Sequence, residues 1–114
     1  MADKIATRDS FSKFLVEYGK THKNLVVMNA DLSASTQTKA FENAYPKRFV
    51  NVGIAEQNLM GVAAGLAVSG KTVVASSFCM FATGRAYEII RNAIGYTGAN
   101  VKVCASHSGL SVGE

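Results

Sequence analysis

One glutamate in this sequence stands where a carboxylate could exchange a proton with a bound molecule. Glu56 opens a helix predicted over residues 56–67, in which apolar side chains recur at helical spacing. A carboxylate in the first turn lies near the positive end of the helix dipole. The helix alone leaves two interpretations open, a capping acid or an acid–base group that acts on a ligand.

The small residues of this helix suggest a close neighbour. Gly61 and Gly65 fall inside the helix. Glycine in a helix interior costs about 1 kcal/mol relative to alanine, so its presence indicates close packing against another backbone. We therefore expect such a neighbour along the small-residue side of the helix.

Short apolar segments alternate with amphipathic segments along the chain. Apolar runs of this length are typical of strands buried in a parallel sheet, and the amphipathic segments are typical of helices that cover it. The alternation predicts the α/β fold class, with a mostly parallel sheet flanked by helices. The predicted strands are 24–29, 48–52, 71–76 and 100–105, and the predicted helices are 7–19, 37–45, 56–67 and 85–94.

Side chains with reactive or ligand-binding groups follow the ends of these predicted strands. In a parallel sheet all strands end at the same edge, and ligands gather at that edge. We therefore expect the following side chains to share one site: Asp31, Ser33, Ser35, Glu56, Phe78, Phe81 and His107.

The composition limits the class of protein. The chain has 114 residues, 48% of them hydrophobic, and a single proline, which fits one ordered domain over residues 1–114. Its net charge of +4 is scattered, so no nucleic-acid partner is indicated. Cys79 and Cys104 have no metal-binding or redox spacing. No signal peptide or membrane-spanning run is recognisable, so we expect a soluble, cytoplasmic protein.

The sequence ends in an unusual place for a domain of this class. Residues 106–114 form a glycine-rich segment after the last predicted strand, and no further strand or helix follows. The segment looks like the first half of a functional loop. We therefore expect a domain that is truncated at its C-terminal end, or one subunit of a split protein.

Four short segments carry a family resemblance by their order and spacing. They are NADLSAS at 29–35, NVGIAEQ at 51–57, SFCMFATGRAY at 77–87 and HSGLSVGE at 107–114. Together they resemble the pyrimidine-binding domain of transketolases, the thiamine-diphosphate enzymes of the pentose phosphate pathway that move two-carbon ketol units between sugar phosphates. The resemblance is closest to the separate C-terminal subunit of split transketolases, and it covers residues 8–114.

The resemblance implies a catalytic role for Glu56. In this family the matching glutamate hydrogen-bonds the N1′ nitrogen of the cofactor's aminopyrimidine and shares a proton with it. That proton favours the imino tautomer, whose 4′-nitrogen then takes the proton from C2 of the thiazolium. A dry, apolar site helps the glutamate to hold its proton. His107 is the second catalytic candidate.

The resemblance also assigns residues to the cofactor and to the substrate. Phe78 and Phe81 match aromatic residues around the aminopyrimidine, and Asp31 matches an acid near the thiazolium. Seen without the family, the two phenylalanines are core residues and the aspartate is a cap or turn former. The positions that match contacts to the sugar phosphate or its hydroxyls are Arg8, Ser35 and His107. Arginine suits phosphate because its planar donors bind two oxygens at once.

One position departs from the family pattern. Many relatives carry a further aromatic residue or an arginine where this sequence has Gly84. Arg85 and Tyr87 are the two neighbours whose side chains can substitute for the side chain that Gly84 lacks. The sequence alone does not distinguish between them.

Other family features are missing from the chain. It has no Gly-Asp-Gly followed by a distant asparagine, the signature that holds Mg²⁺ and the diphosphate, and no metal ligands are assigned to it. The aspartate and histidine that normally follow the position of Glu114 are also absent. The resemblance implies that an N-terminal, diphosphate-binding transketolase subunit supplies the Mg²⁺ site. Thiamine diphosphate then lies across an interface in a dimer or larger homo- or hetero-oligomer, and we expect negligible turnover from this chain alone.

Several alternatives stay open. Deoxyxylulose-phosphate synthase shares the cofactor and the Ala-Glu-Gln element at 55–57, although Asn58 and the segment 78–87 favour transketolase. A 2-oxoacid dehydrogenase beta subunit fits the same residues less well. A phosphoacceptor receiver domain would need an acidic pair after its first strand, where only Asp31 stands. A non-catalytic assembly module is also compatible with the small-residue helix.

Overall fold

The fold is built on a four-stranded sheet in the order β2-β1-β3-β4, in which all neighbouring strands are parallel. The computed structural model describes residues 4–112. The strands are β1 (Leu25–Asn29), β2 (Phe49–Asn51), β3 (Thr72–Ser76) and β4 (Val101–Val103). The predicted α/β fold class is confirmed.

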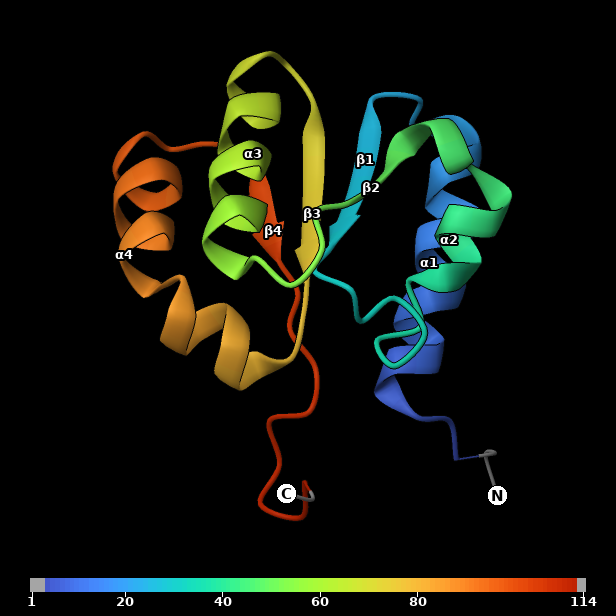
Figure 1. Cartoon of the computed structure of the whole chain (residues 1–114). Helices are drawn as coiled ribbons and strands as arrows, with labels where there is room; N and C mark the ends of the chain where they lie inside the picture. Colours follow the sequence, from blue (N-terminus) through green and yellow to red (C-terminus); the bar gives the residue numbers. More distant parts are fainter. Residues whose placement is uncertain (1–3, 113–114) are drawn as a thin grey trace.

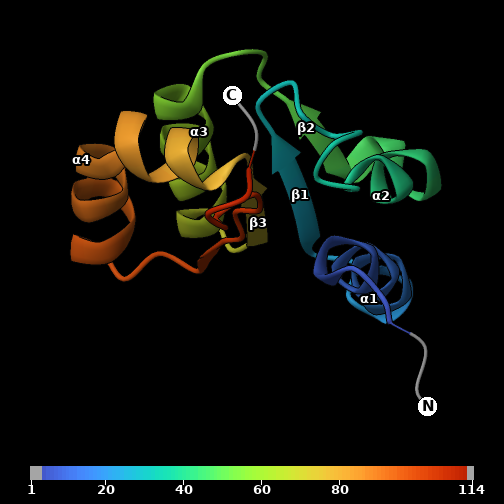
Figure 2. The same cartoon turned by 90° about the horizontal axis from the view of Figure 1, so that it is seen from below.

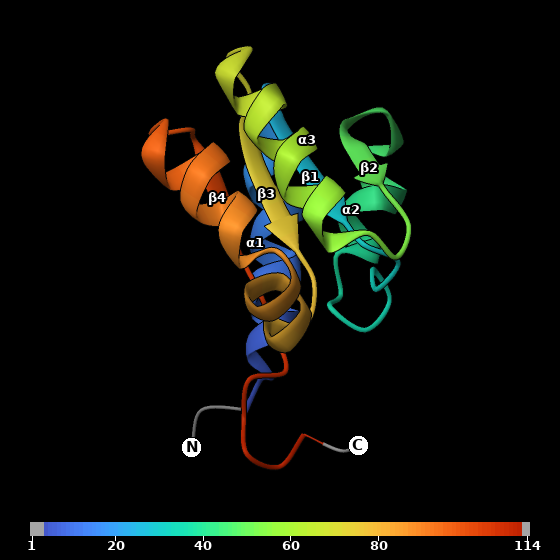
Figure 3. The same cartoon turned by 60° about the vertical axis from the view of Figure 1, so that its left-hand side comes forward.

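Helices cover both faces of this sheet (Figure 1). Figure 2 shows α1 and α2 on one side of the strands and α3 and α4 on the other, and Figure 3 shows α3 lying along β1 and β3. Leu15 and Phe41 form one buried cluster with Val27, whereas Leu59 forms the other with Ala75. The helices are α1 (Thr7–Thr21), α2 (Lys39–Ala44), α3 (Glu56–Val68) and α4 (Tyr87–Ile89).

The helical region after β3 differs from its prediction. The sequence predicts one amphipathic helix over residues 85–94. In the structure, two π-helical segments, η2 (Phe81–Arg85) and η3 (Ile90–Tyr96), flank the short α4. Hydrogen bonds in a π-helix span five residues instead of four, and such turns are frequent at functional sites. Hydrophobic spacing alone does not reveal this change of period.

The boundaries of α2 shift for a local reason. The sequence predicts a helix over 37–45, but the helix begins at Lys39 because Gln37 has a positive φ of 63°, outside the right-handed helical region. The short 3₁₀ segment η1 (Pro46–Arg48) then leads directly into β2. Among residues 4–112, no helix has the length and hydropathy needed to cross a membrane.

Among residues 4–112, no other part of the chain packs against Gly61 and Gly65 of α3. A Cβ built on Gly61 or Gly65 has no heavy atom within 4 Å, and both residues are exposed. The expectation of close backbone packing is therefore wrong within the described residues. The sheet contacts the opposite face of the helix, where Leu59, Met60 and Ala63 are completely buried.

Candidate functional site

Three neighbouring strands end level with one another. Asn29 at the end of β1 pairs in register with Asn51 of β2 and with Ser76 of β3. An isolated bridge between Phe78 and Ser106 continues the pairing of β3 and β4 past their ends. The segments that follow the strands therefore meet at one edge of the sheet, at the bottom of Figure 1 and beside the start of α1.

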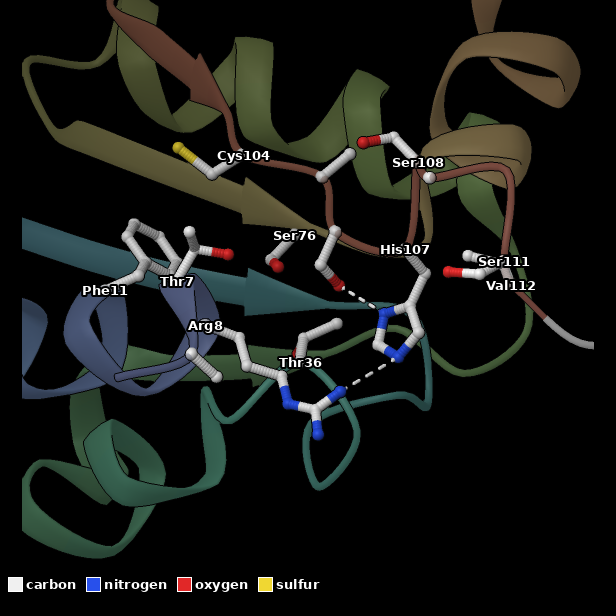
Figure 4. A pocket seen from close by; sticks show the side chains of 14 residues that line it. Thr7, Arg8, Phe11, Thr36, Ser76, Cys104, His107, Ser108, Ser111 and Val112 are labelled. Carbon is white, nitrogen blue, oxygen red and sulfur yellow. Dashed lines mark hydrogen bonds between the residues drawn. The ribbon is translucent and has the colours of Figure 1, made fainter. Parts of the chain in front are cut away.

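Arg8 and His107 meet at this edge, although they are 99 positions apart in the chain. Arg8 Nη1 lies 3.3 Å from His107 Nε2, and Ser106 Oγ lies 2.7 Å from Nδ1 of the same ring (Figure 4). A guanidinium can only donate, so we assign Nε2 as the acceptor and Nδ1 as the nitrogen that donates its proton to Ser106. The two bonds hold the imidazole in one orientation.

A cavity of about 490 Å³ opens between the start of α1 and the segment after β4. Arg8 and His107 line it together with Thr36, Ser76 and Cys104 (Figure 4). A guanidinium beside hydroxyl groups suits a ligand that carries both an anionic group and hydroxyls.

His107 also borders a second cavity, of about 690 Å³. Phe78 and Phe81 line this second cavity, with their ring centroids 5.8 Å apart and their planes inclined by 23°. The His107 ring centroid lies 4.0 Å from that of Phe78. The imidazole is thus shared by the cavity that contains Arg8 and the cavity that contains the aromatic rings.

Glu56 is the first residue of α3 and is only 5% exposed. Its Oε1 accepts a hydrogen bond from Arg85 Nη1 at 3.2 Å, and Arg85 Cζ lies 4.3 Å from the centre of the Phe81 ring. Gln57 Nε2 donates to the backbone carbonyl of Arg85 at 3.2 Å, which joins the first turn of α3 to η2. Arg85 therefore links the buried carboxylate to the aromatic cavity.

The structure distinguishes the two residues that could take the place of a side chain at Gly84. The Arg85 guanidinium contacts both Glu56 and Phe81, whereas the side chain of Tyr87 is directed outward and the residue is 69% exposed. Gly84 and Arg85 both belong to the π-helical segment η2. Arg85 is therefore the residue that reaches the site.

Asp31 and Ser35 lie between β1 and α2 at the same edge of the sheet, and both are exposed. The Asp31 backbone has a positive φ of 60°, and its N–H donates to Asn51 Oδ1 at 3.0 Å. Within the described part of the chain, neither side chain hydrogen-bonds to another candidate residue. The contacts therefore connect Arg8 with His107, His107 with Phe78, Phe78 with Phe81, and Phe81 with Glu56 through Arg85. Asp31 and Ser35 stay at the margin of the site.

A buried polar network, which the sequence analysis missed, holds the segment after β1. Asn29 Nδ2 donates to Thr36 Oγ1 and to Thr38 Oγ1, each at 3.0 Å, and Asn29 Oδ1 accepts from the N–H of Leu32 at 2.7 Å. Asn29 is 0% exposed, and both threonines are 1% exposed. The signal that could have revealed it is an asparagine at the end of an otherwise apolar strand, followed by two threonines.

The cysteine that lines the first cavity has a perturbed thiol. Burial raises the pKa of Cys104 above its ordinary value because desolvation disfavours the thiolate, and the charge of Lys102 opposes this rise. Only the thiolate reacts with alkylating reagents. Cys104 is therefore poorly reactive at neutral pH.

We expect the alkylation rate of Cys104, measured in a Cys79→Ser variant, to rise about tenfold per pH unit up to about pH 9. Mass spectrometry after timed exposure to iodoacetamide gives the rate, and a small free thiol serves as the reference. A Cys104 rate that levels off at lower pH than the reference would contradict a raised pKa.

Known proteins are similar to this chain over most of its length. Residues 3–114 match the family model described as transketolase, pyrimidine binding domain. A protein of Methanocaldococcus jannaschii named as a transketolase C-terminal section is 57% identical over 107 residues, which are 94% of this chain and 34% of that protein. The 6-deoxy-6-sulfo-D-fructose transketolase subunit SqwH of Clostridium sp. (strain MSTE9) is 38% identical over 104 residues, 91% of this chain and 32% of that subunit.

A solved structure extends the similarity to the fold. The structure titled "Split gene transketolase, inactive beta4 tetramer" is 57% identical with a TM-score of 0.83, and the match covers 92% of this chain and 35% of that one. This chain thus spans about a third of the length of these relatives. All of them are transketolases by name, and none favours the deoxyxylulose-phosphate synthase alternative. The chain belongs to the transketolase pyrimidine-binding domain family.

Proposed function

We propose that this chain forms the aminopyrimidine-binding half of a transketolase active site. With a diphosphate-binding subunit, it transfers two-carbon ketol units between sugar phosphates. The observation that carries the proposal is the buried Glu56 carboxylate at the start of α3, linked through Arg85 to the cavity lined by Phe78 and Phe81. The names of the relatives support the transketolase reaction.

The residues present fit thiamine diphosphate, the cofactor that the family implies. Phe78 and Phe81 offer flat aromatic faces beside a cavity, and Glu56 is a carboxyl group at least nine-tenths buried. Ser77, directly after β3, has a buried Oγ without a hydrogen-bond partner among residues 4–112. When bound, thiamine diphosphate supplies a carbon nucleophile and an electron sink for the ketol unit.

Each residue of this half-site has a distinct role toward the cofactor. Glu56 holds a proton at the N1′ nitrogen of the aminopyrimidine, as an acid–base group in a site from which water is excluded. Phe78 and Phe81 pack against that ring, where offset stacking contributes roughly 0.5–1.5 kcal/mol beyond the burial of area. Asp31, farther along the same edge, faces the thiazolium side.

Arg8 and His107 bind the substrate. Arg8 donates to the phosphate of the sugar, and His107, held in one orientation by Arg8 and Ser106, contacts a substrate hydroxyl and takes part in catalysis. Ser35 adds a hydroxyl from the segment after β1. The Clostridium relative is named for a sulfonated sugar. An anionic group on the sugar is common to that compound and to sugar phosphates, and it is the group that a guanidinium recognises.

The other half of the site comes from a partner. A diphosphate-binding N-terminal subunit holds Mg²⁺ and the diphosphate, so this chain has negligible activity by itself. We assign the outer face of α3 to a contact between subunits of this complex, because Gly61 and Gly65 leave it narrow and Val62 and Val68 are 37% and 72% exposed there. A purely structural role in assembly would use the same face without needing Glu56.

We test the proposal in the complex of the full-length subunit with its diphosphate-binding partner, called the assembled complex below. The wild-type complex is expected to transfer ketol units, and Arg8→Met is expected to raise KM for a phosphorylated ketose about 10–100-fold. The reason is the loss of hydrogen bonds to a charged group, which are worth about 1.5–3 kcal/mol.

Two controls accompany the Arg8 variant. Lys13→Met, at an exposed position of α1, makes the same change in charge and should leave KM unchanged. An unphosphorylated ketose should show the same KM with wild-type protein and with Arg8→Met. An equal rise in KM for both ketoses would show that Arg8 does not read the phosphate, and the absence of ketol transfer by a properly assembled wild-type complex would refute the function.

A further inference from the structure

We propose that Arg85 is a positioning residue that holds the Glu56 carboxylate in the free subunit and leaves it when the aminopyrimidine binds. This inference rests on the proposed function of Glu56 and concerns a residue to which that function assigns no role. The evidence is the position of the Arg85 guanidinium, with Nη1 3.2 Å from Glu56 Oε1 and Cζ 4.3 Å from the centre of the Phe81 ring.

The guanidinium makes the two contacts that the cofactor ring requires. It is a flat cation that donates an N–H to Glu56 and lies over the face of Phe81. The proposed aminopyrimidine also meets Glu56 through a ring nitrogen and packs on the same aromatic residues. Glu56 Oε1 and the Phe81 face cannot serve both groups at once, so the guanidinium and the ring compete for one position.

Exposure shows which partner can move. The side chain of Arg85 is 54% exposed and that of Glu56 is 5% exposed. The exposed Arg85 guanidinium can move into water, where it is fully hydrated. The buried Glu56 carboxylate has no second cation to pair with, because Arg85 is the only charged group paired with it among residues 4–112. Gly84, next to Arg85 in η2, has a single neighbouring atom within 4 Å of a built Cβ, Met80 Sδ at 3.9 Å, so the segment is not tightly packed there.

The exchange has a consequence for protons. A buried carboxylate without a cation is unfavourable, so Glu56 takes up a proton when Arg85 leaves, and it shares that proton with the ring nitrogen. One proton comes from solvent for each cofactor bound, and the Arg85 cation stays charged in water. Binding of the cofactor to the assembled complex is therefore coupled to proton uptake.

Calorimetric titration of the assembled complex with thiamine diphosphate and Mg²⁺ tests this coupling. Titrations in two buffers with different ionisation enthalpies give both Kd and the number of protons taken up. We expect about one proton for the wild type. In Arg85→Met, which keeps an apolar stem and loses the donors, we expect Kd to fall about fivefold, because no ion pair has to be broken. Proton uptake should fall toward zero, because a buried Glu56 without its cation is under conditions that favour the neutral carboxyl before the cofactor arrives.

Two further variants make the result specific. Arg91→Met removes the same charge from an exposed position of η3 and should change neither Kd nor the proton count. Arg85→Lys keeps the charge but loses the planar fork, so its Kd should lie between those of the wild type and Arg85→Met, which keeps the test usable if the methionine variant folds poorly. Weaker cofactor binding by Arg85→Met, or an unchanged Kd and proton count, would overturn the inference.

The Glu56→Gln variant distinguishes failure of this inference from failure of the proposed function. If Glu56 meets the ring, Glu56→Gln abolishes proton uptake whatever Arg85 does. If Glu56→Gln binds the cofactor with the wild-type affinity and proton count, the proposed function itself fails. A proton count that changes in Glu56→Gln and not in Arg85→Met leaves the function intact and removes only the role of Arg85.

Discussion

Glu56→Gln is expected to lower ketol transfer by the assembled complex about 10²–10⁴-fold, the usual contribution of an acid–base group. Glutamine has the size of glutamate and keeps an oxygen that can accept the hydrogen bond from Arg85. It cannot hold an exchangeable proton at the ring nitrogen. Steady-state assays with saturating cofactor measure the loss, and size-exclusion chromatography with light scattering measures assembly, which should be unchanged.

The matched control is Glu88→Gln. Glu88 lies on α4, is exposed, and gives the same change in charge outside the site. We expect its activity to stay within about twofold of the wild type, as for a surface substitution of small energetic effect. Full activity of Glu56→Gln in an intact complex would exclude the catalytic role and favour the assembly-module alternative. Loss of both activity and assembly would indicate that Glu56 is needed for the structure of the complex.

Asn29→Ala is expected to lower the free energy of unfolding of the full-length subunit by about 2–4 kcal/mol. The substitution removes both hydrogen bonds to the buried Thr36 and Thr38 hydroxyls and leaves the part-buried N–H of Leu32 without its acceptor. A buried group that loses its partner costs its full desolvation energy, which is larger than the net gain from an ordinary hydrogen bond. Urea denaturation followed by circular dichroism gives the change.

Asn43→Ala is the control for this stability measurement. Asn43 is exposed on α2, so its replacement should change the free energy of unfolding by less than about 0.5 kcal/mol. Because Thr36 also lines the cavity that contains Arg8, we further expect Asn29→Ala to raise KM for the phosphorylated ketose. An Asn29→Ala subunit as stable as the Asn43→Ala subunit would show that the network is not needed to hold the segment.

The sheet could be predicted from the sequence because each strand is a short apolar run between helical patterns. The predicted strand at 24–29 differs by one residue from β1 (Leu25–Asn29), and the one at 71–76 by one residue from β3 (Thr72–Ser76). Burial on both faces of a parallel sheet leaves this signal in composition alone. The π-helical segments left no such signal. Over so few residues, the spacing of apolar side chains is nearly the same in an α-helix and in a π-helix.

The site was only partly accessible from the sequence. Clustering at the strand ends follows from topology, so Phe78, Phe81 and His107 could be placed at one edge before their roles were considered. The contact of Arg8 with His107 could not, because no local pattern relates residues 99 positions apart. Arg85 was one of two open choices, and only the path of η2 decides between it and Tyr87.

The imidazole of His107 constrains how substrate preference can change. One ring forms part of the wall of both cavities, and its backbone has a positive φ of 59°, which few side chains tolerate. Any residue put in its place would alter both cavities together. Under the proposed function, variation that tunes sugar preference is therefore expected at Ser111, which lines the Arg8 cavity and not the aromatic cavity.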